Sequence, residues 1–96
     1  MPDKTFNQDL RVLHLNLHRE FFDEIVRGEK LEEFRDRIDH WKARLDGREY
    51  DIIRFTNGYG PDVPEMDVEW KGVKKRFNKY AIQLGKVLSI RRWPPP

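Results

Sequence analysis

The eight residues from Gly28 to Arg35, with the sequence GEKLEEFR, constrain the fold of this chain more than any other segment. Apolar residues at helical spacing precede Gly28, and glycine is the residue best suited to the left-handed turn past a helix end. An alternating run follows, in which side chains two residues apart share one face of a strand. The segment therefore predicts a helix, a tight reversal near Lys30, and then a strand.

Three charged residues in this segment are expected to lie close together. Glu33 and Arg35 are two residues apart in the predicted strand and share one face, while Lys30 sits at the corner where helix becomes strand. A Lys-Glu-Arg cluster can orient a phosphate or the polar edge of a ligand. The alternative is a salt-bridged trio that only fixes the corner of the fold. Both interpretations remain open from the sequence.

The same residues form the pattern Gly-x-Lys-x-x-Glu-x-Arg, which resembles the signature of the ASCH family. This family is a branch of the PUA-like superfamily of small β-barrel domains. The flanking sequence is similar too: residues 12–17 look like the family's first strand, 21–27 like its helix, and 52–58 like its next strand and loop. The resemblance covers roughly residues 11–90, and it implies a pocket between the helix–strand corner and the loop from Asn57 to Gly60.

The resemblance implies a module that binds RNA or a nucleotide-like ligand in this pocket. Lys30 and Arg35 would hold a phosphate or carbonyl oxygen, and Glu33 would orient them or accept a hydrogen bond from a base amine. Tyr59 could stack on a base, and Asn57 could bond to a base edge. For Tyr59 the alternative is a loop anchor packed on the barrel.

Two further functions follow from the same resemblance. Some ASCH proteins are small amidohydrolases that remove an acyl group from a modified cytidine, using the signature Lys, a distant Glu, and a Thr at the position occupied here by Glu33. Lys30 is then the best catalytic candidate, but Glu33 lacks the hydroxyl that such chemistry needs as a nucleophile. Binding is therefore favoured over catalysis. The third interpretation is a protein-interaction accessory domain whose pocket is vestigial.

Charge is distributed unevenly along the chain. Residues 71–96 contain eight Lys or Arg and no Asp or Glu, whereas residues 1–70 contain eleven basic and seventeen acidic residues, so the two parts carry +8 and −6. Such asymmetry predicts a basic face for a polyanion, and basic residues interleaved with aromatic ones suit RNA. The alternative is an ordinary solvated hairpin. The predicted electrostatic residues are Lys71, Lys74, Lys75, Arg76 and Lys79, and the tail residues Arg91, Arg92 and Trp93 extend the pattern.

Composition limits the other classes of function. At 96 residues the chain is long enough for one domain, and the absence of Cys excludes disulfides and thiol catalysis. His14 and His18 straddle a strand–helix junction rather than one helix face, so we expect neither a metal nor a cofactor. No apolar stretch is long enough to cross a bilayer and no signal segment is recognisable, so we expect a cytoplasmic protein without membrane contact.

The remaining pattern predicts an α+β domain. A second short helix is expected after Ile38, capped by Asp36 or Asp39, and further strands are expected over 50–56, 66–70 and 80–90 with a bulge at Gly85. Two early helices and several late strands favour a PUA-like, mixed and largely antiparallel β-barrel with two short helices. We expect residues 1–10 to be a flexible N-terminal segment, 11–90 the domain, and 91–96 a proline-rich tail that leaves the sheet.

Overall fold

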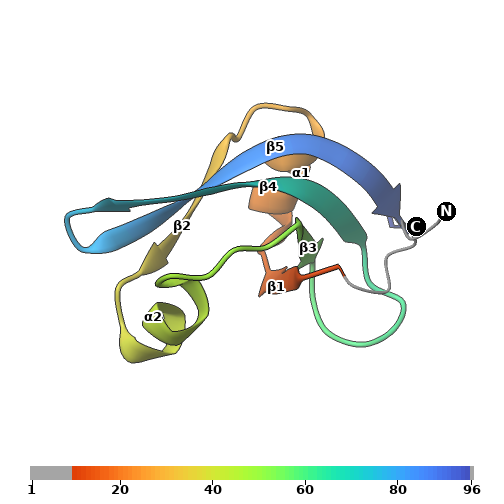
Figure 1. The fold of residues 1–96 in the computed structure, drawn as a ribbon. Coiled ribbons are helices and arrows are strands. Elements are labelled where there is room, and N and C mark those ends of the chain that lie inside the picture. Colours follow the sequence, from red (N-terminus) through yellow and green to blue (C-terminus); the bar gives the residue numbers. More distant parts are fainter. Residues whose placement is uncertain (1–9, 96) are drawn as a thin grey trace, which may run out of the picture.

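The predicted α+β class is confirmed: two helices accompany a curled, mixed five-stranded sheet that forms a half-barrel (Figure 1). The structure, a computed structural model, describes residues 10–95. The predicted flexible segment 1–10 therefore lies almost wholly outside the described residues. In chain order the elements are β1 (Val12–Asn16), α1 (Arg19–Val26), β2 (Glu32–Asp36), α2 (Asp39–Leu45), β3 (Ile52–Thr56), β4 (Glu65–Arg76) and β5 (Lys79–Arg91).

The strand order β1-β3-β4-β5-β2 places β1 and β2 at the two edges of the sheet. The pair β1–β3 is parallel, and the other three pairs are antiparallel, as predicted. β2 pairs with Lys79–Gln83, the first part of β5, and β4 pairs with β5 along most of its length. Because the sheet curls, its two edge strands, β1 and β2, approach each other and leave an open seam between them. In the chain, α1 connects these two strands.

Bulges bend the long β4–β5 hairpin. Val68 pairs with Val87 but Trp70 pairs with Leu84, so β5 carries an extra residue around Gly85, which confirms the predicted bulge. A Cβ at Gly85 would lie 2.5 Å from Oε1 of Glu69, so the strands approach closely there. A second irregularity between Trp70 and Val73 surrounds a glycine with φ of +105°. Each extra residue increases the local twist, which is how a sheet of this size curls.

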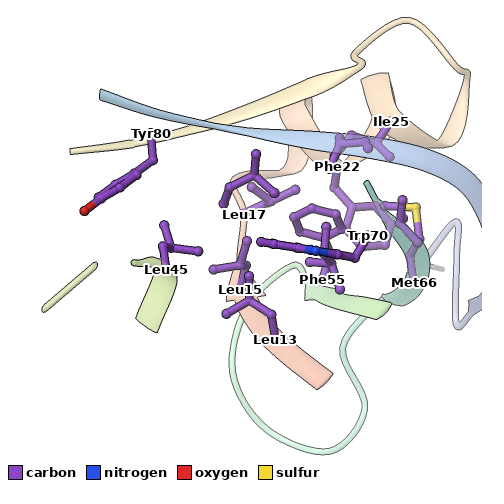
Figure 2. Packing of buried hydrophobic residues seen from close by; sticks show 14 residues of the cluster. Leu13, Leu15, Leu17, Phe22, Ile25, Leu45, Phe55, Met66, Trp70 and Tyr80 are labelled. Carbon is purple, nitrogen blue, oxygen red and sulfur yellow. The ribbon is translucent and has the colours of Figure 1, made fainter. Parts of the chain in front are cut away.

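The core fills the inside of the half-barrel. Alternating residues of β1 point inward with Phe22 and Ile25 of α1, and Phe22, Phe55 and Trp70 gather at the centre of the packed side chains (Figure 2). Fully burying an aliphatic or aromatic side chain stabilises a fold by about 1.5–3 kcal/mol. The core residues are Leu13, Leu15, Leu17, Phe22, Ile25, Leu45, Ile53, Phe55, Met66, Val68, Trp70, Tyr80, Ile82 and Leu84.

The predicted end of the first helix is confirmed. Gly28 has φ of +76°, and the amides of Gly28 and Glu29 donate to the carbonyls of Ile25 and Glu24 at 3.0 and 2.8 Å. These bonds satisfy carbonyls that a helix end would otherwise leave without partners. The chain therefore turns directly into β2.

The predicted cap of the second helix is wrong. The N-cap of α2 is Ile38, which makes no side-chain cap bond. Asp36 is held in β2, where its carboxylate pairs with Lys79, and Asp39 is already the first helical residue. Tertiary pairing thus outweighs a local capping preference.

The C-terminal residues leave the sheet after Arg91 but stay on the protein. Trp93 packs against the core and its indole Nε1 donates to Oδ1 of Asp23 in α1 at 2.7 Å. Arg91 and Arg92 form ion pairs with Glu65. The basic and aromatic character that the sequence extends into the tail is therefore used in packing and pairing. In the described chain, neither helix has the length and apolar character of a membrane span.

Candidate functional site

A concave region of about 410 Å³ lies at the seam between β1 and β2, and we call it the seam pocket. The end of β1, the start of α1, the edge of β2 and one residue each from α2 and β5 contribute to it. Its volume is within the range of sites that hold small molecules. The lining residues are Asn16, Leu17, His18, Phe21, Glu33, Phe34, Arg35, Asp36, Trp41 and Lys79.

The predicted charged trio forms beside this pocket: Glu33 and Arg35 line it, whereas Lys30 lines a second concavity of about 550 Å³ that shares Phe34 with the first. Glu33 is 7% exposed, and its two carboxylate oxygens take different partners. Oε1 lies 3.4 Å from Nζ of Lys30, and Oε2 accepts a hydrogen bond from Nε of Arg35 at 3.0 Å. The trio carries one net positive charge. The trio is intermediate between a fully buried ion pair and a surface ion pair, because the side chains of Lys30 and Arg35 are partly exposed.

Arg35 is the residue that joins the two edges of the sheet. Its Nη2 donates to the carbonyl oxygen of Asn16 in β1 at 3.0 Å, and its guanidinium lies 5.0 Å from the ring centre of Trp41. Nε and Nη2 are thereby occupied. No bond within residues 10–95 engages Nη1, which leaves two N–H donors on the side chain that lines the pocket.

Aromatic rings form much of the remaining wall. Nζ of Lys30 lies 5.3 Å from the ring centre of Phe21 and 5.6 Å from that of Phe34, and Phe34 keeps 46% of its surface exposed. The site thus combines flat apolar surfaces with fixed positive charge. Such a combination suits a planar, electron-rich ligand with an anionic or carbonyl oxygen.

Sequence reasoning did not assign seven of the lining residues to a site: Asn16, Leu17, His18, Phe21, Phe34, Asp36 and Trp41. The sequence suggests His18 only as a metal ligand, although it directly follows a predicted strand and precedes a helix, where loop residues often carry function. Phe21 and Trp41 belong by their spacing to the apolar faces of their helices, and both are in fact only half-buried beside the core. In the sequence, the signal for these two lining residues was an aromatic residue at the end of the apolar face of each predicted helix.

The structure does not bring Asn57 and Tyr59 into the seam pocket. The Asn57 amide Nδ2 donates to the carbonyl oxygen of Leu17 at 2.9 Å, so it supports the wall from behind. Tyr59 is 87% exposed on the β3–β4 loop and is not among the lining residues. The loop is tied to the site by Asn16, whose Nδ2 donates to the carbonyl oxygen of Gly58 at 2.6 Å.

The basic hairpin is largely neutralised by acidic residues of the hairpin itself and of other elements. Lys71 lies 3.7 Å from Glu69, Lys75 lies 3.3 Å from Asp46, and Arg76 lies 2.8 Å from Glu32. Lys79 pairs with Asp36 at the rim of the seam pocket. Of the five predicted electrostatic residues, Lys74 is the one without an ion pair inside the described range.

Two of the carboxylates that neutralise the hairpin, Glu32 and Asp46, have a lowered pKa. Hydrogen bonds from Arg76 and Gln83 hold the pKa of Glu32 below its usual range. A hydrogen bond from the Tyr80 hydroxyl likewise holds the pKa of Asp46 low, against the opposing effect of burial. The uneven charge of the sequence is therefore not reproduced on the folded surface.

The described residues that line the seam pocket include no hydroxyl nucleophile. Among the described residues that line it, none is Ser, Thr or Tyr. The carboxylate of Glu33 is engaged by Lys30 and Arg35. These lining residues therefore supply no hydroxyl nucleophile for acyl transfer.

Comparison of the chain with models of known protein families, with curated proteins and with solved structures found no match. The function of the chain must therefore be inferred from the geometry of the seam pocket.

Proposed function

We propose that this chain is an ASCH-type module with a PUA-like half-barrel, and that it binds RNA or a nucleotide-like ligand in the seam pocket. The observation that carries the proposal is the juxtaposition, in one concavity, of Arg35, which belongs to a net-positive trio, with half-exposed aromatic rings. The signature segment supplies the trio, and the curled sheet supplies the concavity.

Each group has a defined role in this proposal. Nη1 of Arg35 donates to a base carbonyl or phosphate oxygen, and the exposed face of Phe34 stacks on the base. Both oxygens of Glu33 are occupied by Lys30 and Arg35, so Glu33 orients the cations instead of accepting from a base amine. Asn57 acts from behind the wall.

Equilibrium binding of the four ribonucleoside monophosphates and of a short single-stranded RNA tests the proposal. Arg35→Gln removes a charge-assisted donor, and Phe34→Ala removes a stacking surface that is already half-exposed. Each change should lower affinity about tenfold or more, since such interactions are worth about 1.5–3 and 1–3 kcal/mol respectively. Circular dichroism of each variant checks that it remains folded.

Tyr59→Ala is the matched control, because it removes an exposed aromatic ring that does not line the pocket. It should leave the affinity unchanged. Wild-type protein that binds neither nucleotides nor RNA at low salt would refute the proposal. Release of acid from an acylated cytidine, lost in Lys30→Ala, would instead support the hydrolase, and a protein partner that persists after nuclease treatment would support the accessory module.

A further inference from the structure

The tip of the β4–β5 hairpin presents an aromatic residue that the fold itself does not require. The hairpin extends beyond the half-barrel and turns at Phe77 and Asn78 (Figure 1). Phe77 is 95% exposed and has φ of +54°, in the left-handed region. This conformation costs a residue with a Cβ about 1–2 kcal/mol, and Gly or Asn would form the same turn more readily.

Two cations near the tip are not neutralised. Within residues 10–95, neither Lys74 nor Arg37 takes part in an ion pair, unlike their neighbours Lys75, Arg76 and Lys79. Nη1 of Arg37 donates to the carbonyl oxygen of Phe77 at 3.1 Å, so the turn is fixed by the residue that follows β2. The tip thus combines a presented ring with positive charge in excess of its acidic partners.

The tip is also continuous with the seam pocket. Lys79 lines the pocket and is two residues from Phe77, so their Cα atoms are at most about 7 Å apart. The amide of Arg37 donates to the carbonyl oxygen of Asn78 at 3.1 Å, which holds the end of β2 against the turn. A chain that leaves the pocket past Lys79 therefore reaches Phe77 next.

We infer that Phe77 is a second stacking platform, and that the ligand of this site is a single-stranded oligonucleotide rather than a mononucleotide. One base occupies the seam pocket, a neighbouring base stacks on Phe77, and Lys74, which shares a face of the hairpin with Lys79, contacts the intervening phosphate. This inference rests on the proposed function of the pocket. The charge of the tip and the flat ring are both complementary to a single strand, because every base presents a π-face.

Binding of UMP and of hexauridylate to the full chain, measured side by side, tests the inference. Phe77→Ser should lower hexauridylate affinity about tenfold, as expected for the loss of one stacked base, and should leave UMP affinity unchanged. Phe77→Trp should retain the hexauridylate affinity, because it restores a ring. Leu88→Ser is the matched control: Leu88 is another exposed apolar residue of the same hairpin, and its replacement should change neither affinity.

The outcomes separate this inference from the proposal on which it rests. If UMP binds and Phe77→Ser binds hexauridylate as tightly as the wild type does, the platform is refuted while the pocket stands. If hexauridylate binding depends on Phe77 but UMP does not bind and Arg35→Gln has no effect, the platform stands and the pocket is refuted. Wild-type protein that binds neither ligand refutes both.

Discussion

Two clusters of carboxylates and guanidinium groups in this molecule have similar composition and different surroundings. In the cluster of Arg54, Asp67 and Arg91, on β3, β4 and β5, Asp67 accepts from Nε of Arg54 at 2.7 Å and from Nη2 of Arg91 at 3.0 Å. Arg91 also donates through Nε to Glu65 at 2.7 Å. The trio of Lys30, Glu33 and Arg35, in contrast, contributes Glu33 and Arg35 to the lining of the seam pocket.

The contrast shows that a charged cluster becomes a candidate site through the concavity that it borders. The cluster around Asp67 spans neighbouring strands of the sheet and pairs carboxylates with guanidinium groups. The trio lies where the sheet ends and its edges face each other. We therefore expect substitutions in the first cluster to change stability alone, and substitutions in the second to change ligand binding as well.

The largest stability effect is expected at Asp67. Asp67 is 9% exposed, and Asp67→Ala leaves the guanidinium groups of Arg54 and Arg91 without their shared acceptor. Because Arg54 and Arg91 are each about one third exposed and stay close to Glu65, we expect a loss of about 1.5–3 kcal/mol. Urea denaturation at neutral pH measures the loss, and Asp62→Ala, in an exposed loop, should have a negligible effect. Nucleotide affinity should stay the same, and its loss would remove the distinction between the two clusters.

The pH dependence of unfolding provides a second measure of the same cluster. Burial by itself would raise the pKa of Asp67, but hydrogen bonds from Arg54 and Arg91 hold it below its usual range. A lowered folded-state pKa means that this stabilisation is fully present above the unfolded pKa of about 4 and is lost as the pH falls through the folded pKa. The free energy of unfolding should therefore decline less steeply on acidification in Asp67→Ala than in the wild type. Equal slopes would contradict the assignment.

An intermediate effect is expected at Glu33. Glu33→Gln removes the charge that orients Lys30 and Arg35, but the Gln side chain keeps a carbonyl oxygen that can accept a hydrogen bond from one of them. We expect a stability loss of about 1.5 kcal/mol, roughly the value of one hydrogen bond to a charged group. Nucleotide affinity should fall about tenfold, because Arg35 is no longer fixed. A stability loss as large as that of Asp67→Ala, with unchanged affinity, would make the trio purely structural.

Local features of the seam were predictable from the sequence, because they depend on neighbouring residues. The left-handed Gly28, the convergence of Glu33 with Arg35, and the bulge near Gly85 all follow from glycine conformation and strand periodicity. The pocket wall was not predictable in the same way, since Trp41 comes from a helix whose docking depends on the whole sheet.

Charge compensation was the main feature that the sequence could not reveal. Arg76 is 44 residues from Glu32 along the chain, and Lys79 is 43 residues from Asp36. These partners meet only because β2 pairs with the far strand of the hairpin instead of with a sequence neighbour. A count of charges along the chain therefore overstates the basic face. It still identified Lys74, which has no ion pair in the part of the chain that the structure describes.

The smallest change in the free energy of unfolding is expected at the hairpin tip. Unlike the substitutions above, this one should stabilise the fold. Phe77→Asn places a residue that tolerates the left-handed region at φ of +54°, and it removes a side chain that is almost entirely exposed. We expect the free energy of unfolding to rise by about 0.5–1 kcal/mol. Thermal and urea denaturation measure it. A destabilised variant would mean that the ring packs on the protein, contrary to its exposure.

The seam between β1 and β2 has one more consequence. Elsewhere, rows of amide–carbonyl bonds join neighbouring strands, but here the Arg35 side chain reaches the carbonyl oxygen of Asn16. A change of rotamer at Arg35 would release that oxygen and break the bond to Glu33 without disturbing either backbone, and each of these bonds is worth about 1.5–3 kcal/mol. Rotation of the Arg35 side chain alone therefore widens the seam pocket for a larger ligand, while the backbone pairing of the sheet stays intact.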